Sequence, residues 1–206
     1  SLLVNTPSLP FWYRYAKTPT TKIMKSIEME SVKPGQIVLR GGDELFFNEY
    51  VCNFYDYVLD SWRPPSRKIA LYMGCSWHKP FSHSFMHLKV IRMLEKHNLA
   101  DNVQQFIISE PLTICPRELE TRFPAANYDF PPERLGEKGR AIFIERLRRF
   151  IEKYKDFYDF HVGFMPNHHK RIFDESSRGV LRPFYVPYNV YQLPNLLKLL
   201  KQLQSK

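Results

Sequence analysis

Hydrophobic residues follow a strand pattern and a helix pattern in turn along most of the chain. Short apolar runs predict three strands, at residues 69–73, 103–109 and 157–165. Apolar residues at helical spacing predict three helices, at residues 83–97, 139–154 and 192–204. Because parallel strands need a crossover connection, which a helix supplies, this alternation predicts a three-layer α/β/α domain with a mainly parallel sheet.

The first 40 residues differ in character from the rest. They contain several Pro and Thr residues and little periodicity, so we expect residues 1–40 to be an N-terminal extension and residues 41–206 to be the α/β domain. A short apolar stretch at residues 36–39 is compatible with a strand. Helical spacing over residues 44–62, ended by Pro64-Pro65, predicts one further helix.

Three loops follow the predicted strands and hold most of the chain's reactive side chains. They span residues 74–82, 110–132 and 166–170. In an open parallel sheet, ligands bind beyond the carboxyl ends of the strands, where such loops meet. We therefore expect the functional site at this edge of the sheet.

The first loop and the helix after it carry Cys75, Lys79, Ser84 and His87. Ser84 and His87 are three residues apart near the start of the helix, so they share one face. Unpaired N–H groups at a helix start lower the pKa of a nearby thiol. Cys75 is therefore a candidate nucleophile, and a small buried apolar residue is the alternative.

A zinc site is a weaker alternative for the same segment. Residue types that bind zinc occur at Cys75, His78, His83 and His87, but their spacing matches none of the usual paired-ligand patterns. His168-His169 in the third loop would add a ligand or contact phosphate, although an exposed cationic patch with Lys170-Arg171 is the simpler interpretation. We therefore expect no metal and no cofactor.

The second loop sets charged, amide and aromatic groups between prolines, which stiffen the backbone. Its candidate residues are Arg117, Glu118, Asn127, Tyr128 and Asp129. Tyr128 is suited to stacking on a base, and Asp129 or Glu118 to accepting hydrogen bonds from a guanine-like edge or to acid–base catalysis. In the alternative interpretation Arg117 pairs with a glutamate and Tyr128 packs under the loop.

The chain is basic, with 30 Lys and Arg against 21 Asp and Glu and a formal net charge of +9, which favours a polyanionic partner. Candidate phosphate contacts are Arg140, Arg146, Arg148, Arg149, Lys198, Lys201 and Lys206, with merely solvated helix faces as the alternative. The three cysteines form no C-x-x-C pair, and there is no long apolar run and no signal-peptide pattern. These features predict a cytoplasmic protein with no membrane span.

Two motifs resemble one known family. The run Cys-x3-Lys-Pro-Phe-x2-Ser-x2-His, from Cys75 to His87, resembles the signature of archaeosine synthases, archaeal relatives of tRNA-guanine transglycosylases. Residues 109–131 resemble the next segment of the same family. Gly74 stands where the family usually has proline, and Phe81 where it has tyrosine.

The resemblance covers about residues 45–200 and implies the family's central α/β domain, with a fold similar to that of uracil-DNA glycosylases. A glycosylase activity is disfavoured, because the chain has no Gly-Gln-Asp-Pro-Tyr-type loop that activates water.

The resemblance implies an amidine-forming transferase that modifies tRNA in archaeosine biosynthesis. Such an enzyme adds an amine, lysine in the family, to the nitrile of 7-cyano-7-deazaguanine in the dihydrouridine arm, after which a radical-type enzyme completes the conversion. We find no transglycosylase or PUA portion in the sequence, so it resembles a stand-alone or split version of the family's central domain. In the split version a partner protein would carry the missing portions. The alternative is a non-catalytic tRNA-binding subunit.

The chemistry of this reaction leads to a hypothesis about the roles of individual residues. Cys75 would attack the nitrile carbon and form a thioimidate, or else hold a positioning role. His87 and Asp129 would act as acid and base, and Lys79 would lower the thiol pKa or hold a phosphate. The expected substrate-binding residues are Phe81, Ser84, Arg117, Glu118, Asn127 and Tyr128.

Overall fold

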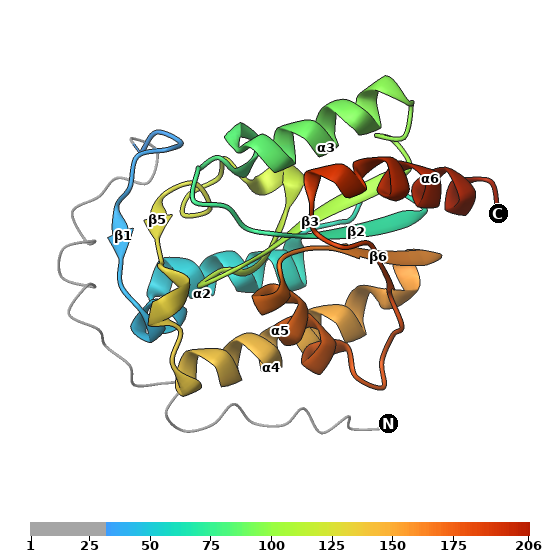
Figure 1. Ribbon diagram of the computed structural model, residues 1–206. Coiled ribbons are helices and arrows are strands. Elements are labelled where there is room, and N and C mark those ends of the chain that lie inside the picture. Colours follow the sequence, from blue (N-terminus) through green and yellow to red (C-terminus); the bar gives the residue numbers. More distant parts are fainter. Residues whose placement is uncertain (1–31) are drawn as a thin grey trace.

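The computed structural model describes residues 32–206, in which a five-stranded sheet lies between two layers of helices (Figure 1). The strand order is β4-β3-β2-β6-β7. The parallel strands are β2 (Ile69–Gly74), β3 (Val103–Ser109), β6 (Phe160–Phe164) and β7 (Phe184–Tyr185), and the antiparallel one is β4 (Thr113–Pro116). The predicted α/β class with a mainly parallel sheet is confirmed.

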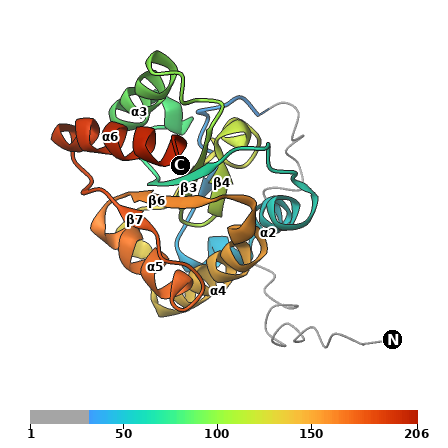
Figure 2. The same ribbon diagram turned by 90° about the vertical axis from the view of Figure 1, so that its right-hand side faces the viewer.

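Strand β2 separates two hydrophobic cores, because its successive side chains point to opposite faces of the sheet. Leu71 and Met73 pack on the side of α3 (Phe85–Lys96) and α6 (Leu193–Gln204), whereas Tyr72 belongs to the other core. That second core is covered by the helices α2 (Glu49–Asp56), α4 (Glu137–Tyr154) and α5 (Asn167–Ser177). Figure 2 shows the two helical layers on either side of the sheet.

The region predicted as one helix over residues 44–62 is three shorter elements. A 3-10 turn (Asp43–Phe47) precedes α2, and a π-helical turn (Tyr57–Ser61) follows it. Asn48 is extended, and its side chain accepts a hydrogen bond from the Tyr50 N–H at 3.0 Å. An asparagine that caps a helix in this way marks a helix start rather than a helix interior.

Two of the helices and strands that have four or more residues, α5 and β4, were not predicted, and neither were the two-residue strands β5 and β7. Helix α5 begins within the segment expected to be a loop at residues 166–170. It was missed because its first turn, Asn-His-His-Lys, carries no apolar pattern, and the apolar Ile172 and Phe173 follow only later. Strand β4 lies within the predicted loop 110–132 and has only four residues, all buried. Helices α3, α4 and α6 confirm the other three helix predictions, with ends shifted by a few residues.

The described part of the predicted extension is attached to the domain. Strand β1 (Leu39–Arg40) pairs in parallel with β5 (Tyr128–Asp129), and Leu39 is fully buried. The Asn127 side chain donates hydrogen bonds to the carbonyls of Lys33, at 2.8 Å, and Gln36, at 2.6 Å. Residues 1–31 of the predicted extension lie outside the described range.

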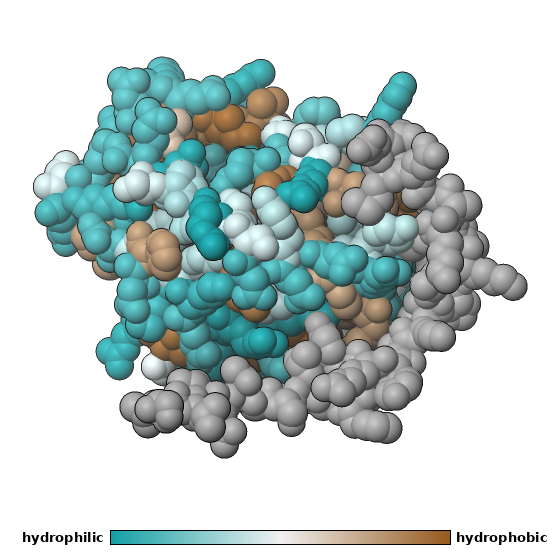
Figure 3. All heavy atoms as spheres, turned by 180° about the vertical axis from the view of Figure 1, so that it is seen from behind, coloured by the Kyte–Doolittle hydropathy of each residue, from teal (hydrophilic) through white to brown (hydrophobic). Residues whose placement is uncertain are grey.

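The face opposite to that of Figure 1 is mainly hydrophilic, with hydrophobic patches separated by polar side chains (Figure 3). No helix within residues 32–206 has both the length and the apolarity that crossing a membrane requires.

Substitution of Phe106 tests the packing of the core that contains Tyr72. Its ring is fully buried and lies 5.8 Å from the Trp62 ring, 5.4 Å from that of Tyr72 and 5.3 Å from that of Phe150. Phe106→Ala is expected to lower the free energy of unfolding by about 3–5 kcal/mol, measured by urea titration. The matched change at Phe157, a ring that is 58% exposed, should cost about 0.5 kcal/mol. Equal losses in the two variants would contradict this description of the core.

Candidate functional site

Three neighbouring strands bring Cys75, Glu110 and His169 together. Cys75 follows β2, Glu110 follows β3 on one side of β2, and His169 lies in the first turn of α5, after β6 on the other side. The Cys75 Sγ lies 3.7 Å from His169 Nε2 and 3.8 Å from Glu110 Oε2, and the last two atoms are 3.1 Å apart. Glu110 and His169 are buried and Cys75 is half-buried. We call these three residues the Cys75 cluster.

Glu110 and His169 form a buried ion pair. Burial opposes the charged imidazolium, but the Glu110 carboxylate and the Cys75 sulfur outweigh it and raise the pKa of His169 to about 10. Burial also pushes the pKa of Glu110 upward, yet the attraction of His169 and its hydrogen bond lower that pKa overall. Both shifts favour the charged pair, with the proton on the imidazole.

Lys79 connects the two motif segments. Its Nζ lies 4.2 Å from the centre of the Tyr128 ring and donates a hydrogen bond to the Ser76 carbonyl at 3.4 Å. Burial lowers the pKa of Lys79, while Cys75 and Asp129 oppose this shift. The Lys79 ammonium group is therefore within electrostatic range of Cys75 and Asp129, two of the residues that were expected to act in catalysis.

His87 supports the backbone before Cys75. Its Nε2 donates to the Gly74 carbonyl at 2.9 Å, and its Nδ1 accepts from Arg117 Nη2 at 2.6 Å. Burial and the Arg117 guanidinium lower the pKa of His87 to about 3, against the effect of the bond to Gly74. His87 is thus neutral, and any proton exchange with a substrate requires one of these two bonds to open.

Arg117 is the centre of a polar network that is partly shielded from solvent. It donates to Gln105 Oε1 at 3.2 Å and forms an ion pair with Glu120 at 2.7 Å, in addition to its contact with His87. The ion pair is the alternative that the sequence left open for Arg117. Glu118 next to it accepts from Trp62 Nε1 and Gln104 Nε2, both at 3.0 Å, so its carboxylate is used within the fold.

The remaining predicted residues differ in what they offer to a ligand. Tyr128 is buried beneath the loop, and its hydroxyl forms a hydrogen bond with that of Ser109. Phe81 is fully buried. Ser84 is buried, and its hydroxyl has no hydrogen-bond partner among the described residues. Asp129 is partly exposed, 3.8 Å from Arg40 Nε.

Sequence reasoning assigned no role to Glu110, and it gave His169 a role only in the weaker alternative of an added metal ligand or a phosphate contact. His169 was expected in an exposed cationic patch, yet it is 1% exposed. One signal was available for Glu110, because a carboxylate directly after a buried strand must find a buried partner. The partner itself is distant in sequence, and only the order of the strands brings it close.

The Cys75 cluster is also where a metal could bind. Its three ligand atoms all lie within 4.8 Å of one another. Within residues 32–206, no other set of three or more Cys, His, Asp or Glu residues is arranged in this way. The set Cys75, His78, His83 and His87 is not assembled, since both ring nitrogens of His87 are held by Gly74 and Arg117.

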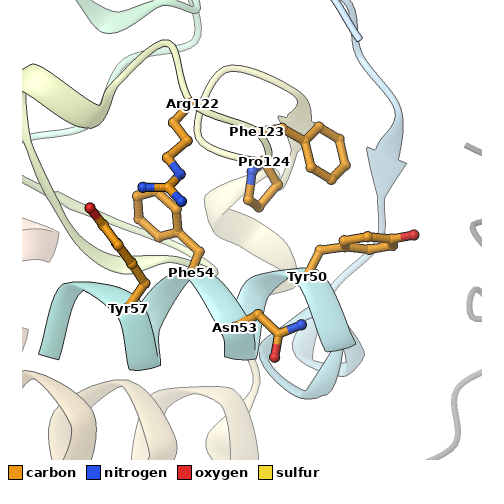
Figure 4. A pocket seen from close by; sticks show the side chains of 7 residues that line it. All are labelled: Tyr50, Asn53, Phe54, Tyr57, Arg122, Phe123 and Pro124. Carbon is orange, nitrogen blue, oxygen red and sulfur yellow. The ribbon is translucent and has the colours of Figure 1, made fainter. Parts of the chain in front are cut away.

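A cavity of about 270 Å³ borders the Cys75 cluster. Its lining comprises the polar residues Glu110, Arg140, His168 and Arg171 and the apolar residues Pro132, Leu135 and Ile172. A smaller hollow of about 90 Å³ lies over α2, where the Arg122 guanidinium covers the Tyr57 ring at 3.9 Å (Figure 4). The first cavity contains site residues and the second does not.

The fold and the cluster together define a class: a three-layer α/β domain with a thiol, carboxylate and imidazole site at the carboxyl ends of its central parallel strands. The chain belongs to the family described as "Domain of unknown function (DUF5591)", whose model matches residues 51–189.

Two curated relatives are named archaeosine synthase subunit alpha. The one from Thermoplasma acidophilum is 32% identical over 134 residues, which are 60% of this chain and 26% of the relative. The one from Methanosarcina acetivorans is 39% identical over 79 residues, 38% of this chain and 12% of the relative. An archaeosine synthase from Methanocaldococcus jannaschii is 29% identical over 119 residues, 56% of this chain and 20% of the relative. The resemblance predicted from the motifs is confirmed, and the chain matches about a quarter or less of each relative's length.

Among solved structures, the fold is similar to the crystal structure of AF0587, a protein of unknown function. The TM-score is 0.52 at 21% identity, over 72% of this chain and 49% of the other. This likeness supports the α/β fold, and the expected similarity to uracil-DNA glycosylases stays a prediction.

The lowered pKa of His87 has a consequence for stability at acid pH. The unfolded chain takes up a proton on this histidine near pH 6.5, whereas the folded protein does so only near pH 3, so stability falls as the pH drops through this window. The slope contributed by His87 is about 1.4 kcal/mol per pH unit at most. Urea unfolding at several pH values should show His87→Gln losing this part of the slope. An unchanged slope in the variant would show that His87 does not cause it.

Proposed function

We propose that this domain adds an amine to the nitrile of 7-cyano-7-deazaguanine in the dihydrouridine arm of tRNA, a step of archaeosine biosynthesis. The observation that carries the proposal is the meeting of the two motif segments: Lys79 of the first lies over Tyr128 of the second, close to Cys75 and Asp129. The names of the curated relatives support the same pathway.

The reaction needs three things from the protein. It must position a nitrile, supply a proton to the nitrile nitrogen, and remove a proton from the attacking amine. We assign these tasks to Cys75, Lys79, His87 and Asp129, with His87 acting through the Gly74 carbonyl that it holds. Residues Phe81, Ser84, Arg117, Glu118, Asn127 and Tyr128 hold in place the two loops that would surround the substrate.

Cys75 has two possible roles in this reaction. In the covalent role, its sulfur bonds to the nitrile carbon, the nitrile nitrogen takes up a proton, and an amine then displaces the thiolate from the thioimidate. In the positioning role, Cys75 holds another group that polarises the nitrile. Both roles give the same amidine without an oxidant or reductant, and lysine or another small amine is the donor.

The charge and exposed aromatic groups of the domain suit a tRNA partner. Arg149, Lys198 and Lys201 are exposed on α4 and α6 and are the candidate phosphate contacts, whereas Arg146 is 1% exposed and unavailable to a phosphate. Trp77, two residues after Cys75, is 69% exposed and is suited to stacking on a base. We further propose that a protein with the transglycosylase and PUA portions, and a radical-type enzyme, act together with this domain.

Incubation of nitrile-bearing tRNA with the protein and a panel of amines tests the activity. The expected result is a mass gain equal to one amine, detected by mass spectrometry of the digested tRNA. Cys75→Ala should lower the rate by about 100-fold or more, as the loss of a nucleophile or of a group that polarises the nitrile does. Cys52→Ala is the matched control, since this thiol contacts Arg146 and Phe46 rather than the cluster. Tight tRNA binding without any mass gain would favour the non-catalytic subunit instead.

Trp77 offers a test of tRNA recognition that does not depend on turnover. Trp77→Ala is expected to weaken tRNA binding by about 1–3 kcal/mol, roughly 5- to 150-fold, because one stacking contact is lost. Fluorescence anisotropy with labelled tRNA measures this. Tyr191→Ala is the matched control, an aromatic side chain that is 84% exposed in the short turn before α6. Equal effects of both substitutions would contradict a specific stacking role.

A further inference from the structure

The three polar atoms of the Cys75 cluster surround a common point. Ligands that bind a tetrahedral zinc at 2.0–2.3 Å are separated from one another by roughly 3.3–3.6 Å. The corresponding separations here are 3.1 Å, 3.7 Å and 3.8 Å, for Nε2 to Oε2, Sγ to Nε2 and Sγ to Oε2. The cluster therefore has the dimensions of one face of a zinc tetrahedron.

The geometry differs from that of a nucleophile, histidine and carboxylate relay. In such a relay one ring nitrogen of the histidine contacts the nucleophile and the other contacts the carboxylate. In this protein the sulfur and the carboxylate both approach Nε2 of His169. The other nitrogen, Nδ1, faces Gly74 and has no hydrogen-bond partner among the described residues. The sulfur, the carboxylate oxygen and Nε2 therefore all lie close to one another, as the ligand atoms of a single ion do.

Charge and burial agree with this geometry. A thiolate and a carboxylate carry two negative charges, which one divalent ion neutralises while the imidazole stays neutral. Glu110 is 2% exposed and His169 is 1% exposed, so water cannot solvate the charge of either side chain well. Thiolate, imidazole and carboxylate are all common ligands of zinc.

We propose that Cys75, Glu110 and His169 bind a zinc ion that keeps its fourth coordination position open. Three protein ligands with an open position are the arrangement of catalytic rather than structural zinc sites. Glu110 also lines the cavity of about 270 Å³, through which a small ligand can approach the ion.

The zinc site itself does not depend on the proposed tRNA reaction. If both hold, they select the positioning role for Cys75, and the ion polarises the nitrile as a Lewis acid. Metal binding is measured without tRNA, so its failure leaves the amidine-forming activity intact. A chain that binds zinc but modifies no tRNA would refute only the proposed function.

Cobalt substitution tests the proposal directly. The 206-residue protein is treated with a chelator, dialysed and titrated with Co²⁺, then with Zn²⁺ in competition. The expected result is one equivalent of bound metal, with a thiolate-to-cobalt charge-transfer band that zinc abolishes. Cys75→Ser should lose the band. Glu110→Gln and His169→Gln should each weaken binding by at least about 100-fold, because even changes in outer-shell partners weaken metal sites by 10–100-fold.

Matched variants separate the site from its surroundings. His168→Gln changes the neighbouring histidine, whose ring lies 3.9 Å from that of His169, and Cys52→Ser changes the other half-buried thiol; both should keep full binding. Zinc should also raise the melting temperature of the wild-type protein and not that of Cys75→Ser. If His169→Gln fails to fold by circular dichroism, the near-isosteric Cys75→Ser and Glu110→Gln variants decide. Absence of stoichiometric binding in the folded wild-type protein, or equal losses in His168→Gln and His169→Gln, overturns the proposal.

Discussion

The site depends on one constraint, the parallel pairing of β2 with a strand on each side. Met73 is in register with Ile107 of β3 and with Phe164 of β6, so the three strands end at nearly the same level. The next residues of each chain segment then leave the sheet at one edge. Parallel strands always direct their carboxyl ends to the same edge, and for this reason a thiol, a carboxylate and an imidazole from distant parts of the sequence can meet there.

The sequence predicted that the site lies at this edge of the sheet, but it identified only some of the residues there. The strands Ile69–Gly74 and Val103–Ser109 were evident because they contain short apolar runs, at residues 69–73 and 106–108, and such runs are typical of buried parallel strands. Helix α5 was missed because its first turn is polar and basic, and the same error placed His169 on the surface. A local pattern cannot show that a polar side chain will be covered by the end of a neighbouring strand.

The motif residues fall into two groups that sequence alone did not separate. Lys79 and Cys75 lie beside the groups expected to react, whereas His87 and Arg117 form a buried support behind them. His87 holds the Gly74 carbonyl, and Arg117 fixes the ring of His87 while pairing with Glu120. This pair is largely shielded from solvent, so removing one partner would leave the charge of the other poorly compensated. The spacing of the motif therefore reflects the support as much as the chemistry.

Gly74 shows how this chain differs from the family pattern that it otherwise resembles. A Cβ atom at this position would lie 2.6 Å from His169 Nδ1 and 2.6 Å from Pro166 Cδ, closer than such atoms approach in proteins. The imidazole can reach Cys75 and Glu110 in this arrangement because residue 74 has no side chain. A proline there, as in the family signature, would need the ring or the start of α5 to move. The identity of residue 74 and the position of His169 are therefore physically coupled, and a change at one requires an adjustment at the other.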